Sequence, residues 1–314
     1  MTHNNVFSGV ITALVTPFLE NNDIDFESFE KILRTQKKAK VNGVVVLGTT
    51  GESPTLNKDE SIELVKKALN FQDDNFHIYL GTGTNCTRSS IEKTQSFMDI
   101  QAKNGQKAKG AMLVCPYYNK PTQDGIFKHF SEILENCQNN VCIYNVPGRT
   151  VTSIAPKTLV KLFMKYPNAV AVKEASGDMN QITEIKLGLQ SIGRNDVELL
   201  SGDDSSFAYS LICGVSGIIS VASHILPQTF LSLLSAFKDN NLGAIQKLHL
   251  KMSPLLNKIY SLPNPVGIKA ALSELGLCKP HVRAPLVSVN PKEMSLFKDF
   301  TDEIRKEFKE KDLL

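Results

Sequence analysis

The sequence lacks the apolar segments that mark membrane proteins and secreted proteins. No apolar run in its 314 residues approaches the ~20 residues of a membrane span. Residues 1–8 are polar and contain no apolar signal region. We therefore expect a cytoplasmic protein that has no membrane partner.

The cysteines lack the spacing of a metal or redox site. The chain has 6 cysteines, with no C-x-x-C pair and no histidine at zinc-ligand spacing beside them. Cys115, Cys142 and Cys213 lie in apolar stretches, which favours free buried thiols over disulfides. The sequence thus predicts no metal centre and a reducing compartment.

Concentrated charge is also missing. Lysine and arginine number 35 against 32 acidic residues, and the net charge of +3 is spread along the chain. The short basic run at residues 37–40 is typical of a solvated helix face. This pattern excludes an electrostatic footprint for nucleic acid. A composition of 42% hydrophobic and 21% charged residues indicates a soluble globular protein with a sizeable core.

What the chain does have is an alternation of short apolar, β-rich segments with amphipathic helical segments. Helical patterns such as 58–69 and 87–103 separate the segments, which implies parallel strand pairing. The eight expected strands cover residues 10–16, 43–47, 77–81, 111–115, 141–144, 169–173, 198–201 and 217–221.

Eight such units match a (β/α)8 TIM barrel, which typically needs ~250 residues. A doubly wound open sheet is the alternative, and the count of eight disfavours it. We predict an α/β barrel domain over residues 1–240 and a C-terminal helical region over 241–314. Helices are expected there at 243–260, 265–275 and 291–309.

Lys173 interrupts the end of an apolar, β-branched segment that is typical of a central parallel strand. A lysine is almost never fully buried without a partner, and burying its ammonium costs free energy. A neutral amine, by contrast, attacks carbonyl compounds and forms a Schiff base. The alternative is a strand-end lysine whose head reaches water. Tyr144 and Arg149, at the end of the preceding strand, could serve the Schiff-base chemistry.

Other expected strands also end in polar or glycine-rich segments. Residues 48–53 (GTTGES) could hold a carboxylate through backbone N–H groups, or could form a glycine turn with Ser53 or Asn57 capping a helix. Residues 116–121 (PYYNKP) suit a rigid loop at a wet or intersubunit surface, or simple packing. Gly202 suggests a close backbone approach, and the two aspartates after it suggest a helix cap.

Four motifs together carry a family resemblance. They are GTTGE at 48–52, YYNKP at 117–121, YNVPGRT at 144–150 and VKEA at 172–175. In order and spacing the chain resembles the dihydrodipicolinate synthase family, also called 4-hydroxy-tetrahydrodipicolinate synthase, from about residue 9 to residue 289. The wider superfamily of pyruvate-dependent aldolases, which includes N-acetylneuraminate lyase, shares the lysine and tyrosine but generally lacks the arginine. Arg149 is therefore the discriminating residue.

The resemblance implies a role for each motif residue. Lys173 forms the Schiff base with pyruvate, and Tyr144 is the general acid/base beside it. Thr49, together with Tyr118 of a neighbouring subunit, completes a hydroxyl relay with Tyr144. Thr50 binds the carboxylate of pyruvate, and Arg149 binds the carboxylate of L-aspartate-4-semialdehyde. Gly202 and the backbone of Ile219 line the pyruvate site. The resemblance also implies a homotetramer of two tight dimers, with no cofactor and no metal.

Elementary chemistry supports these roles. A free lysine has a pKa of ~10.4, and a desolvated barrel mouth lowers it. We expect the charge of Arg149 to acidify the nearby phenol of Tyr144. A guanidinium also matches a carboxylate with two parallel hydrogen bonds, which an ammonium does not.

We therefore predict a lyase that condenses pyruvate with L-aspartate-4-semialdehyde in the diaminopimelate and lysine pathway. Two alternatives remain: the same chemistry on a sugar-derived 2-keto acid, and a binding or regulatory barrel without catalysis. Members of the family are often inhibited by lysine. This chain keeps Ser53, Asn85 and Tyr117 of that site but has Lys58, Ser61 and Ser89 at its other positions, so we predict weak or absent inhibition.

Overall fold

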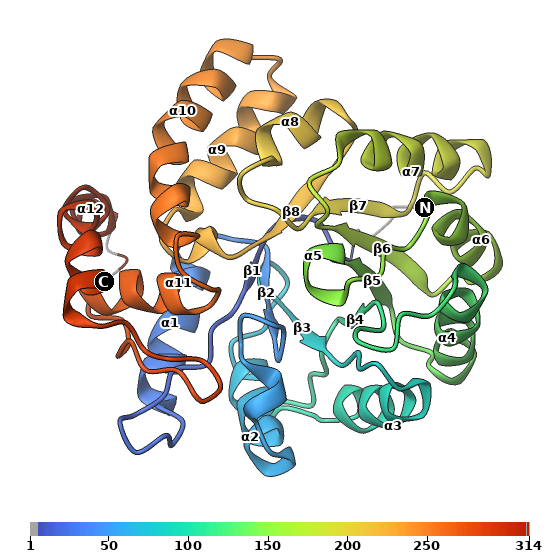
Figure 1. The fold of residues 1–314 in the computed structure, drawn as a ribbon, viewed down its shortest axis with the longest axis horizontal. Coiled ribbons are helices and arrows are strands. Elements are labelled where there is room, and N and C mark those ends of the chain that lie inside the picture. The colour runs from blue at the N-terminus through green and yellow to red at the C-terminus, as the bar shows by residue number, and fades with distance from the viewer. Residues whose placement is uncertain (1–5, 312, 314) are drawn as a thin grey trace. The chain divides into compact units, whose positions relative to one another are not determined.

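The strands of the computed structural model, which describes residues 6–311 and 313, form a closed parallel barrel in chain order. This confirms the predicted TIM barrel (Figure 1). The strands are β1 (Gly9–Ala13), β2 (Gly43–Val46), β3 (His77–Gly81), β4 (Gly110–Val114), β5 (Val141–Asn145), β6 (Ala169–Glu174), β7 (Glu198–Ser201) and β8 (Gly217–Ser220).

Helices alternate with the strands and continue beyond the last one. They are α1 (Phe26–Lys38), α2 (Lys58–Leu69), α3 (Thr87–Met98), α4 (Gln123–Asn136), α5 (Pro147–Thr150), α6 (Pro156–Lys165), α7 (Met179–Ser191), α8 (Phe207–Ile212), α9 (Pro227–Lys238), α10 (Leu242–Ile259), α11 (Val266–Glu274) and α12 (Pro291–Glu310). Short 3-10 turns occupy Ser53–Thr55 and Ala222–His224.

Most predicted elements agree closely with the observed ones, with two exceptions. The strand predicted over 10–16 ends at Ala13, although residues 14–16 remain buried, and one helix is shorter than predicted. The bounds of β3, β7 and α2 coincide with the predictions, and the three predicted C-terminal helices are α10, α11 and α12. The helix predicted over 87–103 ends at Met98. Irregular backbone and turns replace its last residues and lead to Gly105, where φ is +80°, while Ala102 stays buried and so prolongs the apolar pattern.

The chain divides into two compact units. The first comprises Ile78–Ile219 and the N-terminal segment up to Gly9. In it β3 to β8 pair in parallel, and the register sets Tyr144 beside Lys173 and Lys173 beside Leu200. Strand residues are buried almost throughout, as expected of parallel strands covered by helices. In Figure 1, α3, α4, α6 and α7 form this helical layer.

The second unit comprises Val10–His77 and Ser220–Leu314. Here β1 pairs with β2, and the helices are α1, α2 and α9 to α12. Asn57 begins α2 with a reciprocal cap, because its side chain accepts from Glu60 N–H and the Glu60 carboxylate accepts from Asn57 N–H. Of the two capping residues considered for this loop, Asn57 is therefore the one that caps α2.

Two further observations bear on the sequence predictions. Among the helices of the described residues, none combines the length and hydropathy required to cross a bilayer. All six cysteines are free, with Cys115 and Cys142 buried and Cys213 half-buried. The division of the chain at residue 240 stays a prediction.

Candidate active site

Lys173 lies at the end of β6 and is buried, with 5% of its surface exposed. Its Nζ sits over the ring of Tyr144, 4.2 Å from the ring centroid. The two residues are register partners on adjacent parallel strands, which fixes their proximity. Burial lowers the pKa of Lys173 to about 8, against the opposing charges of Cys142 and Asp204 and with a smaller contribution from Arg149. The predicted lowering is confirmed.

Gly202 gives the Lys173 side chain its space. A Cβ at this position would lie 2.7 Å from Lys173 Cε and 2.6 Å from the Cβ of Ala175. Those distances are too short for ordinary contacts, so any larger residue at 202 would displace the lysine. The close approach predicted for this glycine is confirmed, and what approaches it is the stem of Lys173.

The phenol of Tyr144 behaves differently from the prediction. Burial raises its pKa to about 12, and the charge of Arg149 opposes this effect without overcoming it. The expectation of an acidified phenol was therefore wrong, because desolvation of the phenolate outweighs the attraction of the guanidinium. At neutral pH Tyr144 keeps its proton and can both donate and accept a hydrogen bond.

Arg149 lies in α5, the single helical turn that follows β5, and its side chain is exposed. Pro147 begins this turn, and Thr150 closes it by donating its hydroxyl to the carbonyl groups of Val146 and Thr152. The guanidinium therefore stands on a short, well-tied turn, and its charge lowers the pKa of both Tyr144 and Lys173.

Asn145 and Glu174 follow Tyr144 and Lys173 in the sequence, and alternation along a strand turns their side chains to the opposite face. Asn145 Nδ2 donates to Glu174 Oε2 at 2.9 Å, and Gln181 Nε2 donates to the same oxygen at 2.8 Å. The backbone N–H of Ser176 donates to Oε1. This buried network joins the ends of β5 and β6 and so holds the two reactive side chains in register.

Tyr118 lies in the loop after β4, and 86% of its surface is exposed. Its φ of +75° falls in the left-handed region, which non-glycine residues seldom adopt. Asn119 ties the loop to the preceding strand end by donating to the carbonyl of Asn85 at 3.1 Å. The loop thus projects a tyrosine away from its own chain.

The ends of β7 and β8 complete the first unit. Asp203 accepts from the N–H of Ser206, the residue before α8, but α8 begins without a side-chain cap, so the helix-capping role expected of the aspartates is wrong. Asp204 instead is buried, and its charge raises the pKa of Lys173. Ile219 is fully buried at the end of β8.

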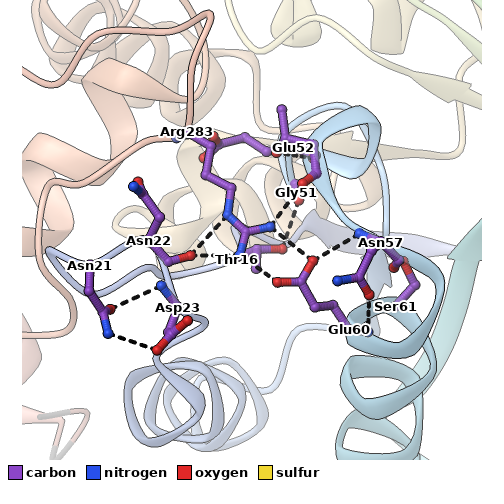
Figure 2. A network of polar contacts seen from close by, with 11 residues as sticks. Thr16, Asn21, Asn22, Asp23, Gly51, Glu52, Asn57, Glu60, Ser61 and Arg283 are labelled. Carbon is purple, nitrogen blue, oxygen red and sulfur yellow. Dashed lines mark hydrogen bonds and ion pairs between the residues drawn. The ribbon is translucent and has the colours of Figure 1, made fainter.

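In the second unit, the loop after β2 carries Thr49 and Thr50. Thr49 is exposed, whereas Thr50 is 3% exposed and its Oγ1 accepts from Asn264 Nδ2 at 3.0 Å. The Thr16 hydroxyl donates to the carbonyl of Gly51 at 2.7 Å (Figure 2). The two threonines therefore present one exposed hydroxyl and one buried hydroxyl that is held by Asn264.

The sequence analysis missed the residues that hold this loop. The Glu52 carboxylate is buried and accepts from Lys269 Nζ at 2.5 Å and from the backbone N–H of Arg283 at 3.0 Å. The Arg283 side chain in turn pairs with Glu60 at 2.5 Å (Figure 2). The signal for Lys269 was present, since it interrupts the apolar run of residues 266–272 just as Lys173 interrupts its strand. Pairing with Glu52 could not be read from the sequence.

A metal site is not what these residues form. Among the side chains that the structure describes, no three histidines, cysteines, aspartates or glutamates gather closely enough to hold a metal ion.

Known proteins share both the sequence and the fold. A 4-hydroxy-tetrahydrodipicolinate synthase of Thermotoga maritima is 38% identical over 298 residues, which cover 95% of this chain and 99% of that protein. The solved structure of dihydrodipicolinate synthase from Thermotoga maritima superposes with a TM-score of 0.87 at 36% identity and covers 98% of this chain and 100% of that one.

A second solved structure is the chloride-inhibited dihydrodipicolinate synthase of Acinetobacter baumannii in complex with pyruvate. It matches with a TM-score of 0.83 at 31% identity and covers 98% of this chain and 99% of that one. The model of the dihydrodipicolinate synthetase family matches residues 6–303. A buried lysine beside a tyrosine in a closed parallel barrel, and sequence identity over nearly the whole length, together place this chain in the dihydrodipicolinate synthetase family.

Proposed function

We propose that this chain is a lyase that condenses pyruvate with L-aspartate-4-semialdehyde through an imine on Lys173, in the diaminopimelate and lysine pathway. The observation that carries the proposal is the buried Lys173 amine, whose pKa is lowered to about 8 and which lies 4.2 Å from the ring centroid of Tyr144. A pKa near 8 leaves roughly a tenth of the amine neutral at pH 7, against under a thousandth for a free lysine.

The chemistry begins with the Lys173 amine adding to the ketone carbon of pyruvate. Loss of one water gives the imine, and removal of a methyl proton gives an enamine. The enamine carbon then attacks the aldehyde carbon of the semialdehyde, whose oxygen takes up a proton. Attack by the semialdehyde's own amine on the imine carbon closes the ring and releases Lys173. Tyr144, which keeps its proton at neutral pH, supports these proton transfers as donor and acceptor.

The family resemblance supplies the remaining roles. We assign Thr49 and Tyr118 to the hydroxyl relay, Thr50 to the pyruvate carboxylate, and Gly202 with the backbone of Ile219 to the lining of the pyruvate site. Arg149 is assigned to the carboxylate of the semialdehyde, for which its exposed guanidinium has the right charge and planar geometry.

Two proposals concern the state of the protein in the cell. The 86% exposure of Tyr118 supports its use by a neighbouring copy, and hence a homo-oligomer, which we propose to be a tetramer of two tight dimers. Six free cysteines support a reducing compartment, which we propose to be the cytoplasm.

Borohydride trapping tests the proposed function. Reduction in the presence of pyruvate should add one pyruvyl group, seen by intact mass, and peptide mapping should place it on Lys173. Lys269, equally buried, serves as the internal control and should stay unmodified. In separate assays, the untreated protein should turn over the semialdehyde in the presence of pyruvate and should not cleave N-acetylneuraminate or 2-keto-3-deoxygluconate. A protein that gives no adduct, or an adduct on another lysine, does not use this mechanism.

A further inference from the structure

Asn264, two residues before α11, touches a residue of the proposed pyruvate site and has no assigned role. We propose that it is a positioning residue: its amide donates to Thr50 Oγ1 and thereby turns the Thr50 hydroxyl proton outward, toward the substrate carboxylate. The inference rests on the proposed function, in which Thr50 binds the carboxylate of pyruvate.

The contact is well defined on both sides. Asn264 Nδ2 lies 3.0 Å from Thr50 Oγ1, although the two residues are 214 positions apart. Thr50 is 3% exposed and Asn264 is half-buried. Asn264 Oδ1 is buried and finds no partner within the described part of the chain. The contact is therefore made at the expense of an unpaired oxygen, which a purely structural asparagine would avoid.

The donor and acceptor capacity of the Thr50 hydroxyl explains what the contact with Asn264 does. A threonine hydroxyl has one proton to donate and two lone pairs that accept. Because Asn264 Nδ2 donates to one lone pair of Thr50 Oγ1, the hydroxyl proton of Thr50 stays available. The described side chains and backbone provide no acceptor for that proton. A carboxylate can only accept, so it requires this orientation. The reversed amide would take the proton and leave lone pairs facing the substrate.

The surrounding network keeps both partners in place. The segment that carries Asn264 continues into α11, where Lys269 Nζ binds the Glu52 carboxylate at 2.5 Å. Glu52 follows Thr50 by two residues and adopts a left-handed φ of +51°, while Thr16 holds the carbonyl of Gly51 (Figure 2). The segment from Asn264 to Lys269 thus contacts the loop after β2 at two points, Thr50 and Glu52, and both contacts hold the loop in place.

The matched variants are Asn264→Asp and Asn264→Ala. Aspartate has the same shape but replaces the donor by a charged acceptor, so it takes the Thr50 proton and repels a carboxylate. Trapping on Lys173 measures the pyruvate concentration that gives half-maximal adduct. We expect that concentration to rise about 100-fold for Asn264→Asp and about 5-fold for Asn264→Ala, with kcat at saturating pyruvate changed less.

The controls separate orientation from folding. Asn104→Asp adds the same charge on an exposed loop and should leave trapping unchanged. All variants should keep their unfolding midpoints. In a Thr50→Val background, which lacks the hydroxyl, Asn264→Ala should have no further effect on the pyruvate dependence.

Two results would overturn the inference. If Asn264→Asp binds pyruvate better than Asn264→Ala, the residue acts by its shape or as an acceptor. If Asn264→Ala weakens pyruvate equally with and without the Thr50 hydroxyl, it acts independently of Thr50. Both results are interpreted on the condition that the protein without substitutions forms the Lys173 adduct with pyruvate. An unchanged protein that forms none refutes the proposed function itself, and the inference with it.

Discussion

Two buried lysines, Lys173 and Lys269, share the same sequence signal but differ in their surroundings. Each interrupts an apolar run, and neither is more than 5% exposed. Lys269 donates to the Glu52 carboxylate at 2.5 Å and to the carbonyl of His281 at 2.8 Å. Lys173 forms no ion pair with a carboxylate in the part of the chain that the structure describes, and lies over the Tyr144 ring.

The comparison shows that burial alone does not make a lysine a nucleophile. Burial lowers the pKa of both amines, but the charge of Glu52 opposes the effect at Lys269 and favours the ammonium there. At Lys173 the charges of Cys142 and Asp204 raise the pKa by less than desolvation lowers it. The partner, rather than the depth, separates a structural cation from a reactive amine.

Lys173→Met should give the largest effect. Without the amine no imine forms, so turnover should fall on the order of 10⁴-fold or more. Stability should move the other way, because the ammonium is buried at a cost. A native pKa of about 8 instead of 10.5 costs roughly 3 kcal/mol at pH 7, so we expect a gain of about 1–3 kcal/mol in urea unfolding.

The size of that gain depends on pH. Between pH 8 and 10.5 the unfolded chain binds more protons at Lys173 than the native protein does. The free energy of unfolding of the unsubstituted protein therefore rises with pH over this range. The advantage of Lys173→Met should therefore shrink over this range. A variant that is less stable than the unchanged protein at pH 7 would instead make Lys173 a structural cation.

Lys269→Met should act oppositely and cost about 3–5 kcal/mol of unfolding free energy, because it leaves the Glu52 carboxylate buried and unpaired. The double variant Glu52→Gln/Lys269→Met removes the charge as well and should recover much of the loss. Urea unfolding of Glu52→Gln, Lys269→Met and the double variant measures the coupling. Additive losses would mean that the two residues are not an effective pair.

Arg149→Ala should impair use of the semialdehyde far more than imine formation. Loss of a charge-assisted pair with a desolvated carboxylate should lower kcat/KM for the semialdehyde by about 2–4 kcal/mol. Borohydride trapping of pyruvate is the control and should persist. Equal losses in trapping and turnover would mean that Arg149 supports the fold or the pyruvate site.

The pH dependence of trapping should report on Lys173. Its rate should rise about tenfold per pH unit below the pKa and level off above pH 8. Because the charge of Arg149 contributes to the lowering, Arg149→Ala should move this midpoint to higher pH. Tyr144, with a pKa of about 12, should add no second transition below pH 10. A midpoint near that of free lysine would contradict the desolvated site.

Free lysine should give the smallest effect. Free lysine carries ammonium groups and would need an acidic partner, as Lys269 has in Glu52. Ser89 is uncharged, and Lys58 is exposed and positively charged. The Ser61 hydroxyl is committed to the carbonyl of Asn57. We expect initial rates to change little in a lysine titration. Strong inhibition at submillimolar lysine would show that other residues bind it.

Sequence reasoning located the strands well because parallel strands buried on both faces are continuous apolar runs. It singled out Lys173 for the same reason, since a charged residue stands out in such a run. Prediction failed at the end of α3, where buried Ala102 prolonged the apolar pattern past the last helical residue. Apolar patterns in the sequence predict which residues are buried, but they do not predict where a helix ends.

Local periodicity and residue type were enough to predict the barrel, most of the strands and the motif residues. Which groups face each other became known from the three-dimensional structure. It paired Lys269 with Glu52 and Asn264 with Thr50 across more than two hundred residues, and it set burial above the Arg149 charge at Tyr144. Electrostatic effects depend on distance and desolvation in space, and neither is a property of sequence order.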